Sequence, residues 1–175
     1  MEFPALSENK NTDVLIIGGG PMGTLFALTY NAEGVDVRIA EINELRRNIL
    51  TSWGIQTATL DECYAAADYD KIIVAVNKKE LVEEAVAKVR DGGTVHVFAG
   101  LPSGTILNIN GNDLHYRKVS MTGSSGFSMN TFHRAFEFIK ANPANYERMI
   151  THVFPLEKGE EAFDMLRSGE AFKIM

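Results

Sequence analysis

Asp13-Val-Leu-Ile-Ile-Gly-Gly-Gly-Pro-Met-Gly23 joins a short apolar run to glycines with the spacing Gly18-x-Gly20-x-x-Gly23, and a helical pattern follows. In a strand, turn and helix of this kind, the first glycine permits a sharp turn and the second leaves room for a phosphate beside the backbone. The third allows the helix to pack closely on the strand. Unpaired N–H groups and the helix dipole favour an anion at such a helix N-terminus. The stretch predicts a turn that binds the diphosphate of a dinucleotide; a turn that serves packing alone is the alternative.

A carboxylate downstream supports the binding interpretation. Residues 35–40 are expected to form a second strand, and Glu41 at its end lies roughly 20 residues after the glycine turn, where a carboxylate meets the adenosine ribose. Such a carboxylate repels a 2′-phosphate, which favours NAD over NADP. Arg38, Arg46 and Arg47 lie nearby in sequence and leave NADP open.

Composition favours one compact globular domain. The chain has 175 residues, of which 45% are hydrophobic and 23% charged. Its net charge is −6, and without a basic run it is not expected to bind nucleic acid. No apolar run has membrane-spanning length, and the polar leader at residues 1–12 lacks the features of an export signal, so a cytoplasmic location is expected.

Predicted strands and helices alternate after residue 12, which is typical of an α/β fold with a parallel sheet covered on both faces. We expect a three-layer, doubly wound Rossmann fold of about six strands. The expected strands are 13–17, 35–40, 56–59, 71–76, 94–99 and 119–122, and the main expected helices are 22–33, 44–53, 61–67, 80–90 and 129–140. Loop 100–104 should then lie at the carboxyl edge of the sheet, where open α/β folds bind ligands.

Four motifs occur in the order found in one known family. They are 14–23, 91–100, 114–126 and 150–156, and the chain after residue 12 resembles the coenzyme half of the zinc-type medium-chain alcohol, sorbitol and threonine dehydrogenases. The resemblance implies an NAD-binding Rossmann domain at 13–142. It also implies that 143–175 is a segment of the catalytic domain, most of which precedes the coenzyme domain in this family.

The resemblance also implies which residues contact the coenzyme. Those matching pyrophosphate-binding positions are Gly18, Gly20, Pro21 and Met22, with Gly23 closing the turn. Those on the adenosine side are Glu41 at the ribose, Arg46 beside the adenine, and Val76 and Asn77 at the end of the fourth strand. Those nearer the nicotinamide are Ala99, Gly100, Leu101, Ser124 and Ser125. Asn77 stands where glycine is usual and Glu41 where aspartate is commoner, so the adenine side departs from the family pattern.

No zinc site is expected in this chain. A catalytic zinc needs three protein ligands, whereas Cys63, His96, His115, His133 and His152 lack ligand spacing. The resemblance places the zinc in the GroES-like domain that precedes the coenzyme domain, so no catalytic residue is expected here. His96 is expected to pack inside a strand, and His115 and His133 to lie at the surface.

These observations predict the NAD(H)-binding domain of a zinc-dependent enzyme that oxidises an alcohol or polyol by hydride transfer, inactive as an isolated chain. A free-standing NAD-binding redox sensor is the alternative. A short-chain dehydrogenase is disfavoured because none of the five tyrosines has a lysine four residues later.

Two surfaces are expected to need partners. The family pairs its coenzyme domains through an edge strand, and residues 105–109 match its place, which predicts a homodimer. The C-terminal segment carries apolar side chains that would be exposed without the catalytic domain or fold back on the sheet: Phe154, Leu156, Phe163, Met165, Leu166 and Phe172.

Overall fold

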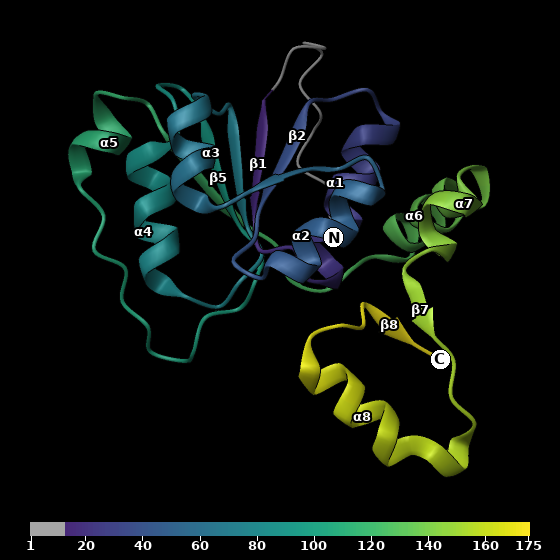
Figure 1. Ribbon diagram of the computed structural model, residues 1–175. Coiled ribbons are helices and arrows are strands. Elements are labelled where there is room, and N and C mark those ends of the chain that lie inside the picture. The colour runs from purple at the N-terminus through teal and green to yellow at the C-terminus, as the bar shows by residue number, and fades with distance from the viewer. Residues whose placement is uncertain (1–12) are drawn as a thin grey trace.

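The computed structural model describes residues 13–175 and contains a six-stranded parallel sheet with the strand order β3-β2-β1-β4-β5-β6 (Figure 1). The strands are β1 (Val14–Ile17), β2 (Val37–Ala40), β3 (Gln56–Ala58), β4 (Lys71–Val74), β5 (Thr94–Val97) and β6 (Ser120–Gly123). The order reverses between β1 and β4, which is the point where doubly wound sheets open a crevice for ligands. The predicted Rossmann fold with six strands is confirmed.

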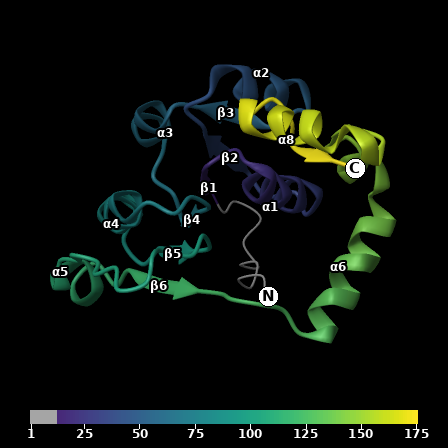
Figure 2. The ribbon, with the colours of Figure 1, turned by 90° about the horizontal axis from the view of Figure 1, so that it is seen from below.

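Helices cover both faces of the sheet. Those that precede the C-terminal segment are α1 (Pro21–Ala32), α2 (Glu44–Ser52), α3 (Leu60–Ala66), α4 (Lys79–Lys88), α5 (Gly111–His115) and α6 (Met129–Ala141). One buried cluster joins α1 and α2 to the sheet, and a second joins α3 and α4 to the opposite face. Figure 2 shows α3 and α4 on one side of the strands and α1 on the other.

The central strand β1 is apolar along its whole length because both faces of the sheet are covered. In β1, Val14 and Ile16 pack toward α1, whereas Leu15 and Ile17 pack toward α4, and all are buried. Burying such a side chain contributes about 1.5–3 kcal/mol relative to leaving it exposed. This core fixes the position of the glycine turn, which leaves the end of β1 directly.

Arg117 secures the C-terminal end of α4 to the segment before β6. Its guanidinium donates to the carbonyl oxygens of Val86 (3.2 Å), Ala87 (3.1 Å) and Val89, and forms ion pairs with Asp91 (2.8 Å) and Asp113 (3.0 Å). These two carboxylates raise the pKa of Arg117 above its usual value. The last carbonyl groups of a helix otherwise lack a partner, so this side chain acts as a cap.

Arg117→Ala is expected to lower the free energy of unfolding by about 2–3 kcal/mol, because several carbonyl and carboxylate contacts are lost together. Urea denaturation followed by circular dichroism measures the change. Arg117→Lys keeps the charge but not the planar fork, so its stability should fall between the two. Wild-type stability in the alanine variant would contradict the capping role.

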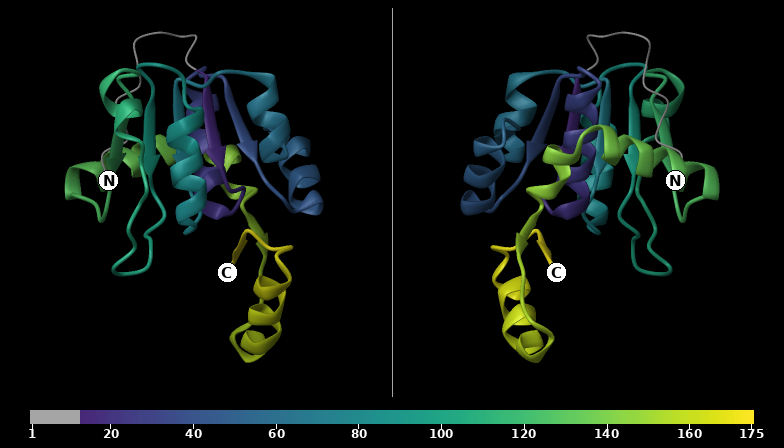
Figure 3. Two further views of the ribbon diagram at one scale, coloured as in Figure 1. Left: turned by 90° about the vertical axis from the view of Figure 1, so that its left-hand side faces the viewer. Right: turned by 90° about the vertical axis from the view of Figure 1, so that its right-hand side faces the viewer.

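The C-terminal segment begins with α7 (Pro143–Glu147), which contacts α1 and α6. The rest of the segment forms a small unit beyond the carboxyl edge of the sheet (Figure 3). It comprises β7 (Ile150–His152), the 3-10 turn η1 (Leu156–Lys158), α8 (Gly159–Ser168) and β8 (Lys173–Ile174), and β7 pairs in parallel with β8. Some apolar residues of the C-terminal segment are exposed and others fold back on the Rossmann domain, and both outcomes were expected. Phe172 is only 2% exposed and packs on the α1-face cluster, whereas Leu156 is 94% exposed.

Residues 105–109 form no strand within the described part of the chain, and their predicted pairing with a second copy stays a prediction. Their exposure nevertheless alternates as in an extended chain: Ile106 is 77% exposed, whereas Leu107 and Ile109 pack on the α4-face cluster. None of the helices described is long and apolar enough to cross a membrane.

Candidate functional site

The glycine turn has the shape that its sequence predicts. Gly18 adopts φ +105°, which disfavours any side chain, and its N–H donates to the carbonyl of Ala40 at 2.8 Å. A Cβ at Gly23 would stand 1.9 Å from the carbonyl oxygen of Gly18, so only glycine allows α1 to lie this close to the turn. A Cβ at Gly20 would meet nothing within 4 Å. Gly20 therefore leaves open space above the turn.

The N-terminus of α1 suits an anion. Gly20 is the N-cap, Pro21 follows it, and no side chain among residues 13–175 caps the helix. The first turn carries no acidic residue that would repel a phosphate. The free N–H groups and the open space at Gly20 fit the pyrophosphate of a dinucleotide.

Glu41 lies directly against this turn and is only 7% exposed. Its Oε2 accepts from the N–H of Gly19 at 2.8 Å, and its Oε1 accepts from the N–H of Asn43 at 2.8 Å. Arg46 approaches Oε2 at a longer distance of 3.4 Å. A carboxylate has about four acceptor positions, so the described contacts leave at least one for a ligand.

Each of the three arginines near Glu41 in sequence has partners in the structure, and Arg46 pairs with Glu41 itself. Arg46 donates its Nη2 to the carbonyl of Gly169 at 2.9 Å and lies over the ring of Phe172. Arg47 donates to the carbonyl groups of Glu41 and Ile42. Arg38 bonds Gln56 and Tyr69 and lines a separate cavity of about 230 Å³ at the amino end of β1 and β2.

The end of β4 contacts the other side of the turn. A Cβ at Gly18 would come within 2.6 Å of Cγ1 of Val76, which places Val76 against the first glycine. Asn77 follows and is exposed. The glycine turn is therefore flanked by Glu41 and Val76 at the carboxyl edge of the sheet, where β1, β2 and β4 end.

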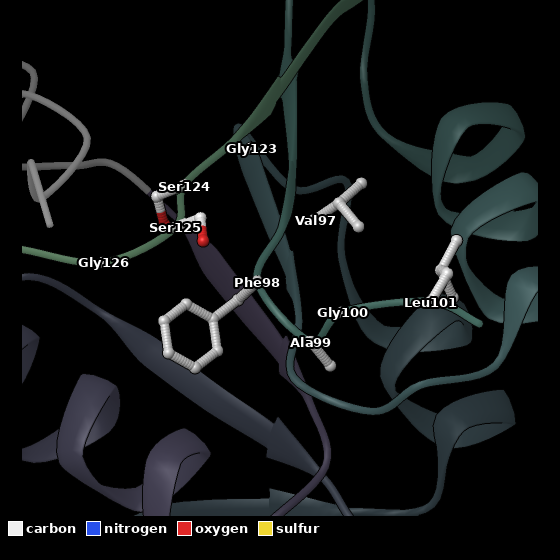
Figure 4. A pocket seen from close by; sticks show the side chains of 9 residues that line it. All are labelled: Val97, Phe98, Ala99, Gly100, Leu101, Gly123, Ser124, Ser125 and Gly126. Atoms are coloured by element: carbon white, nitrogen blue, oxygen red, sulfur yellow. The ribbon is translucent and has the colours of Figure 1, made fainter. Parts of the chain in front are cut away.

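A pocket of about 670 Å³ opens between the ends of β5 and β6 (Figure 4). Five of its lining residues are the predicted nicotinamide-side positions Ala99, Gly100, Leu101, Ser124 and Ser125. The other four are Val97, Phe98, Gly123 and Gly126. The ring of Phe98 packs edge-on against Phe26 of α1, with ring centroids 4.8 Å apart, so this pocket is braced by the helix that carries the glycine turn.

His96 is buried in β5, as its strand position predicts, but its polar contacts were not foreseen. Nδ1 lies 2.9 Å from Oγ1 of Thr122, and Nε2 lies 3.1 Å from Oγ of Ser124. Burial, assisted by the charge of Lys71, lowers the pKa of His96 below its ordinary value. The pairing of His96 with Thr122 depends on the register between β5 and β6, which local sequence patterns do not reveal.

Residues 13–175 contain no group of three or more His, Cys, Asp or Glu side chains placed to hold a metal ion. His115 and His133 are exposed, and Cys63 is buried. The donor set of the described residues therefore does not fit a catalytic zinc, which needs three converging ligands.

The family model for zinc-binding dehydrogenases matches residues 21–141, from the first residue of α1 to the last residue of α6. The chain belongs to this family. The matched residues include Gly23 at the end of the glycine turn, Glu41, and the pocket between β5 and β6. The resemblance that the four sequence motifs carry is thereby confirmed.

The zinc-binding dehydrogenase chain is similar to longer proteins. It is 26% identical over 175 residues to the L-threonine 3-dehydrogenase of Bacillus subtilis (strain 168), an alignment that covers 91% of this chain and 49% of that protein. The chain therefore spans about half the length of the curated relatives it matches.

Solved structures of alcohol dehydrogenases share the fold. An alcohol dehydrogenase from E. coli CFT073 complexed with NADH superposes with a TM-score of 0.82 at 18% identity, over 95% of this chain and 52% of that one. A putative zinc-binding dehydrogenase from Sinorhizobium meliloti 1021 bound to NADP gives 0.75 at 22% identity, over 86% and 48%. Structural neighbours thus hold either nicotinamide dinucleotide.

Proposed function

We propose that this chain is the NAD(H)-binding half of a zinc-dependent dehydrogenase that oxidises an alcohol or polyol. The observation that carries the proposal is the buried carboxylate of Glu41, which is hydrogen-bonded to the glycine turn at the switch point of the sheet. This arrangement brings a diphosphate site and an acceptor for ribose hydroxyls into contact.

Each part of the site has a distinct role. The N–H groups at the start of α1 bind the diphosphate, and Glu41 accepts from the adenosine ribose. The pocket between β5 and β6 receives the nicotinamide, whose C4 carries the hydride when the coenzyme is bound. Phe98, braced by Phe26, orients that end of the coenzyme, which shortens the search for a reactive geometry.

The contacts around Glu41 support NAD rather than NADP. A ribose diol can donate two hydrogen bonds, and the longest existing contact of Glu41, at 3.4 Å to Arg46, is the one most readily displaced. A 2′-phosphate would face the carboxylate instead. Arg46 already pairs with that carboxylate and with Gly169, and Arg38 and Arg47 donate to Gln56 and to backbone carbonyl groups. NADPH is therefore expected to bind more weakly than NADH.

The other half of the enzyme supplies the zinc and most of the substrate pocket in this proposal. Two observations support it: the relatives are about twice as long, and α6 and α8 expose apolar side chains. Those on α6 are Met129, Phe132, Phe136 and Ile139, and those on α8 are Phe163 and Leu166. We assign 13–142 to the coenzyme domain and 143–175 to the catalytic domain on the same grounds.

The isolated chain is expected to bind NADH but not to oxidise alcohols or polyols, with or without added zinc. Enhancement of NADH fluorescence measures the first, and the absorbance of NADH formed from NAD and a polyol measures the second. Zinc-dependent turnover by this chain alone would refute the division of labour. The redox-sensor alternative would be supported by a different result: NADH binding changes the self-association of the chain, and adding a catalytic half restores no turnover.

We further propose that two copies pair through residues 105–109, in line with the alternating exposure of that segment. Ile106→Asp should raise the dimer dissociation constant at least tenfold, because it introduces charges into an apolar edge. Sedimentation velocity over a concentration series measures this. Ile42→Asp is the matched control, since Ile42 is also exposed but lies after β2. A monomer at every concentration of the wild-type chain would refute the pairing.

A further inference from the structure

His96 connects the buried sheet to the wall of the nicotinamide-side pocket. One ring nitrogen bonds Thr122, which lies opposite it in β6, and the other bonds Ser124, which lies beyond the end of β6 and lines the pocket. His96 is only 4% exposed, so its imidazole is enclosed by the surrounding residues. Figure 4 shows Ser124 and Ser125 on the segment leaving β6, across the pocket from Gly100 and Leu101.

The ring is neutral near pH 7, because burial and the nearby charge of Lys71 hold the pKa of His96 below its usual value. A neutral imidazole has one N–H donor and one acceptor nitrogen. It therefore donates to one of its two hydroxyl partners and accepts from the other. The hydroxyl of Ser124 has its direction and its free hydrogen-bonding capacity fixed by this ring.

A serine hydroxyl has one proton and two lone pairs, so one contact with His96 leaves capacity for a ligand. The pocket it faces is otherwise lined by small or apolar residues, apart from Ser125. A primary carboxamide offers both a donor and an acceptor, and therefore matches a hydroxyl of either polarity. We propose that His96 is a positioning residue that holds the Ser124 hydroxyl ready to bind the carboxamide of the nicotinamide.

This inference rests on the proposed coenzyme function and adds a residue and a contact to it. If His96 served only to join β5 to β6, its hydrogen bond to Thr122 would be enough. The second contact reaches past the strand into the loop that forms the pocket wall, which is where a ligand would meet it.

Two substitutions separate the two ring nitrogens. The amide of glutamine reaches about as far as Nε2, so His96→Gln retains the contact with Ser124. The shorter asparagine amide corresponds to Nδ1, so His96→Asn retains only the contact with Thr122. We expect His96→Asn to weaken NADH binding roughly fivefold to tenfold, the effect of one lost hydrogen bond, and His96→Gln to stay within about twofold of wild type.

ADP-ribose is the control ligand, because it carries the diphosphate and both riboses but lacks the nicotinamide. Both variants should bind it as the wild-type chain does, in calorimetric titrations run beside those with NADH. Equal losses for ADP-ribose and NADH would show that His96 serves only the fold, and would overturn the positioning role. Wild-type NADH affinity in His96→Asn would also overturn it.

A double-mutant cycle tests whether His96 acts through Ser124. Ser124→Ala should weaken NADH binding as much as His96→Asn does. The double variant should bind NADH no more weakly than either single variant. Thr122→Val, which removes the contact with Nδ1, should leave NADH affinity within about twofold of wild type. Additive losses would refute the coupling. If the wild-type chain binds neither NADH nor ADP-ribose, the proposed coenzyme function fails and this inference falls with it. If it binds ADP-ribose but gains nothing from the nicotinamide, the adenosine and diphosphate sites stand and only the inference is refuted.

Discussion

Replacing Glu41 with alanine is expected to weaken NADH binding about 30- to 150-fold, which corresponds to about 2–3 kcal/mol for charge-assisted bonds to the ribose. The loss has a second source. The carboxylate also accepts from the N–H groups of Gly19 and Asn43, so its removal should loosen the turn to which we assign the diphosphate. Calorimetric titration of the variant with NADH measures the change.

NADPH distinguishes the ribose contact from general loosening of the turn. Without the carboxylate, the repulsion of a 2′-phosphate disappears, so the preference of Glu41→Ala for NADH over NADPH should shrink by at least tenfold. Glu41→Gln keeps the size and one carbonyl oxygen but loses the charge, so its NADH affinity should lie between the alanine variant and wild type. An equal loss of affinity for both nucleotides would contradict a direct ribose contact.

Gly20→Ala and Gly23→Ala are expected to separate binding from folding. At Gly23 an added methyl group would stand 1.9 Å from a backbone oxygen that cannot move independently, so we expect a loss of about 2–4 kcal/mol in the free energy of unfolding. At Gly20 the backbone has φ −68° and ψ 179°, which alanine adopts freely, and the added methyl group would meet no neighbour. Its stability should stay within about 0.5 kcal/mol of wild type.

Both variants should bind NADH more weakly than the wild-type chain, for different reasons. The methyl group of Gly20→Ala occupies the space that the diphosphate needs, so we expect at least 30-fold weaker NADH binding by a fully folded protein. Thermal unfolding and NADH titration of both variants measure the two effects. A folded Gly20→Ala variant with wild-type affinity would mean that the glycine turn serves packing alone.

Much of the candidate site was predictable because its signals are local. The turn chemistry of Gly18, Gly20 and Gly23 depends on backbone shape, which neighbouring residues determine. Glu41 was predictable because a strand of known length carries it to the same sheet edge. The apolar run of β1 likewise specified a strand that is buried on both faces.

Contacts between distant segments were not predictable in the same way. The bond from Arg46 to the carbonyl of Gly169 joins α2 to the end of α8, and no periodicity encodes it. The contact of His96 with Ser124 requires the register of β5 against β6. The ring of Phe172 is buried against Trp53 although the resemblance assigned its segment to another domain.

The segment 105–109 shows a different limit. Its alternating pattern favours an extended conformation, but a strand also needs a hydrogen-bonded neighbour. The residue pattern of 105–109 meets the first condition, but it does not reveal a neighbouring strand. A second copy of the chain would supply the missing edge, which is why the strand prediction is tested by the oligomeric state rather than by the single chain.

Calorimetric titration of the wild-type chain with NADH, beside an identical titration with NADPH, tests the central claim most directly. We expect saturable binding of one NADH per chain and at least tenfold weaker binding of NADPH. Failure of both nucleotides to bind a folded chain would contradict the claim that Glu41 and the glycine turn form a working coenzyme site.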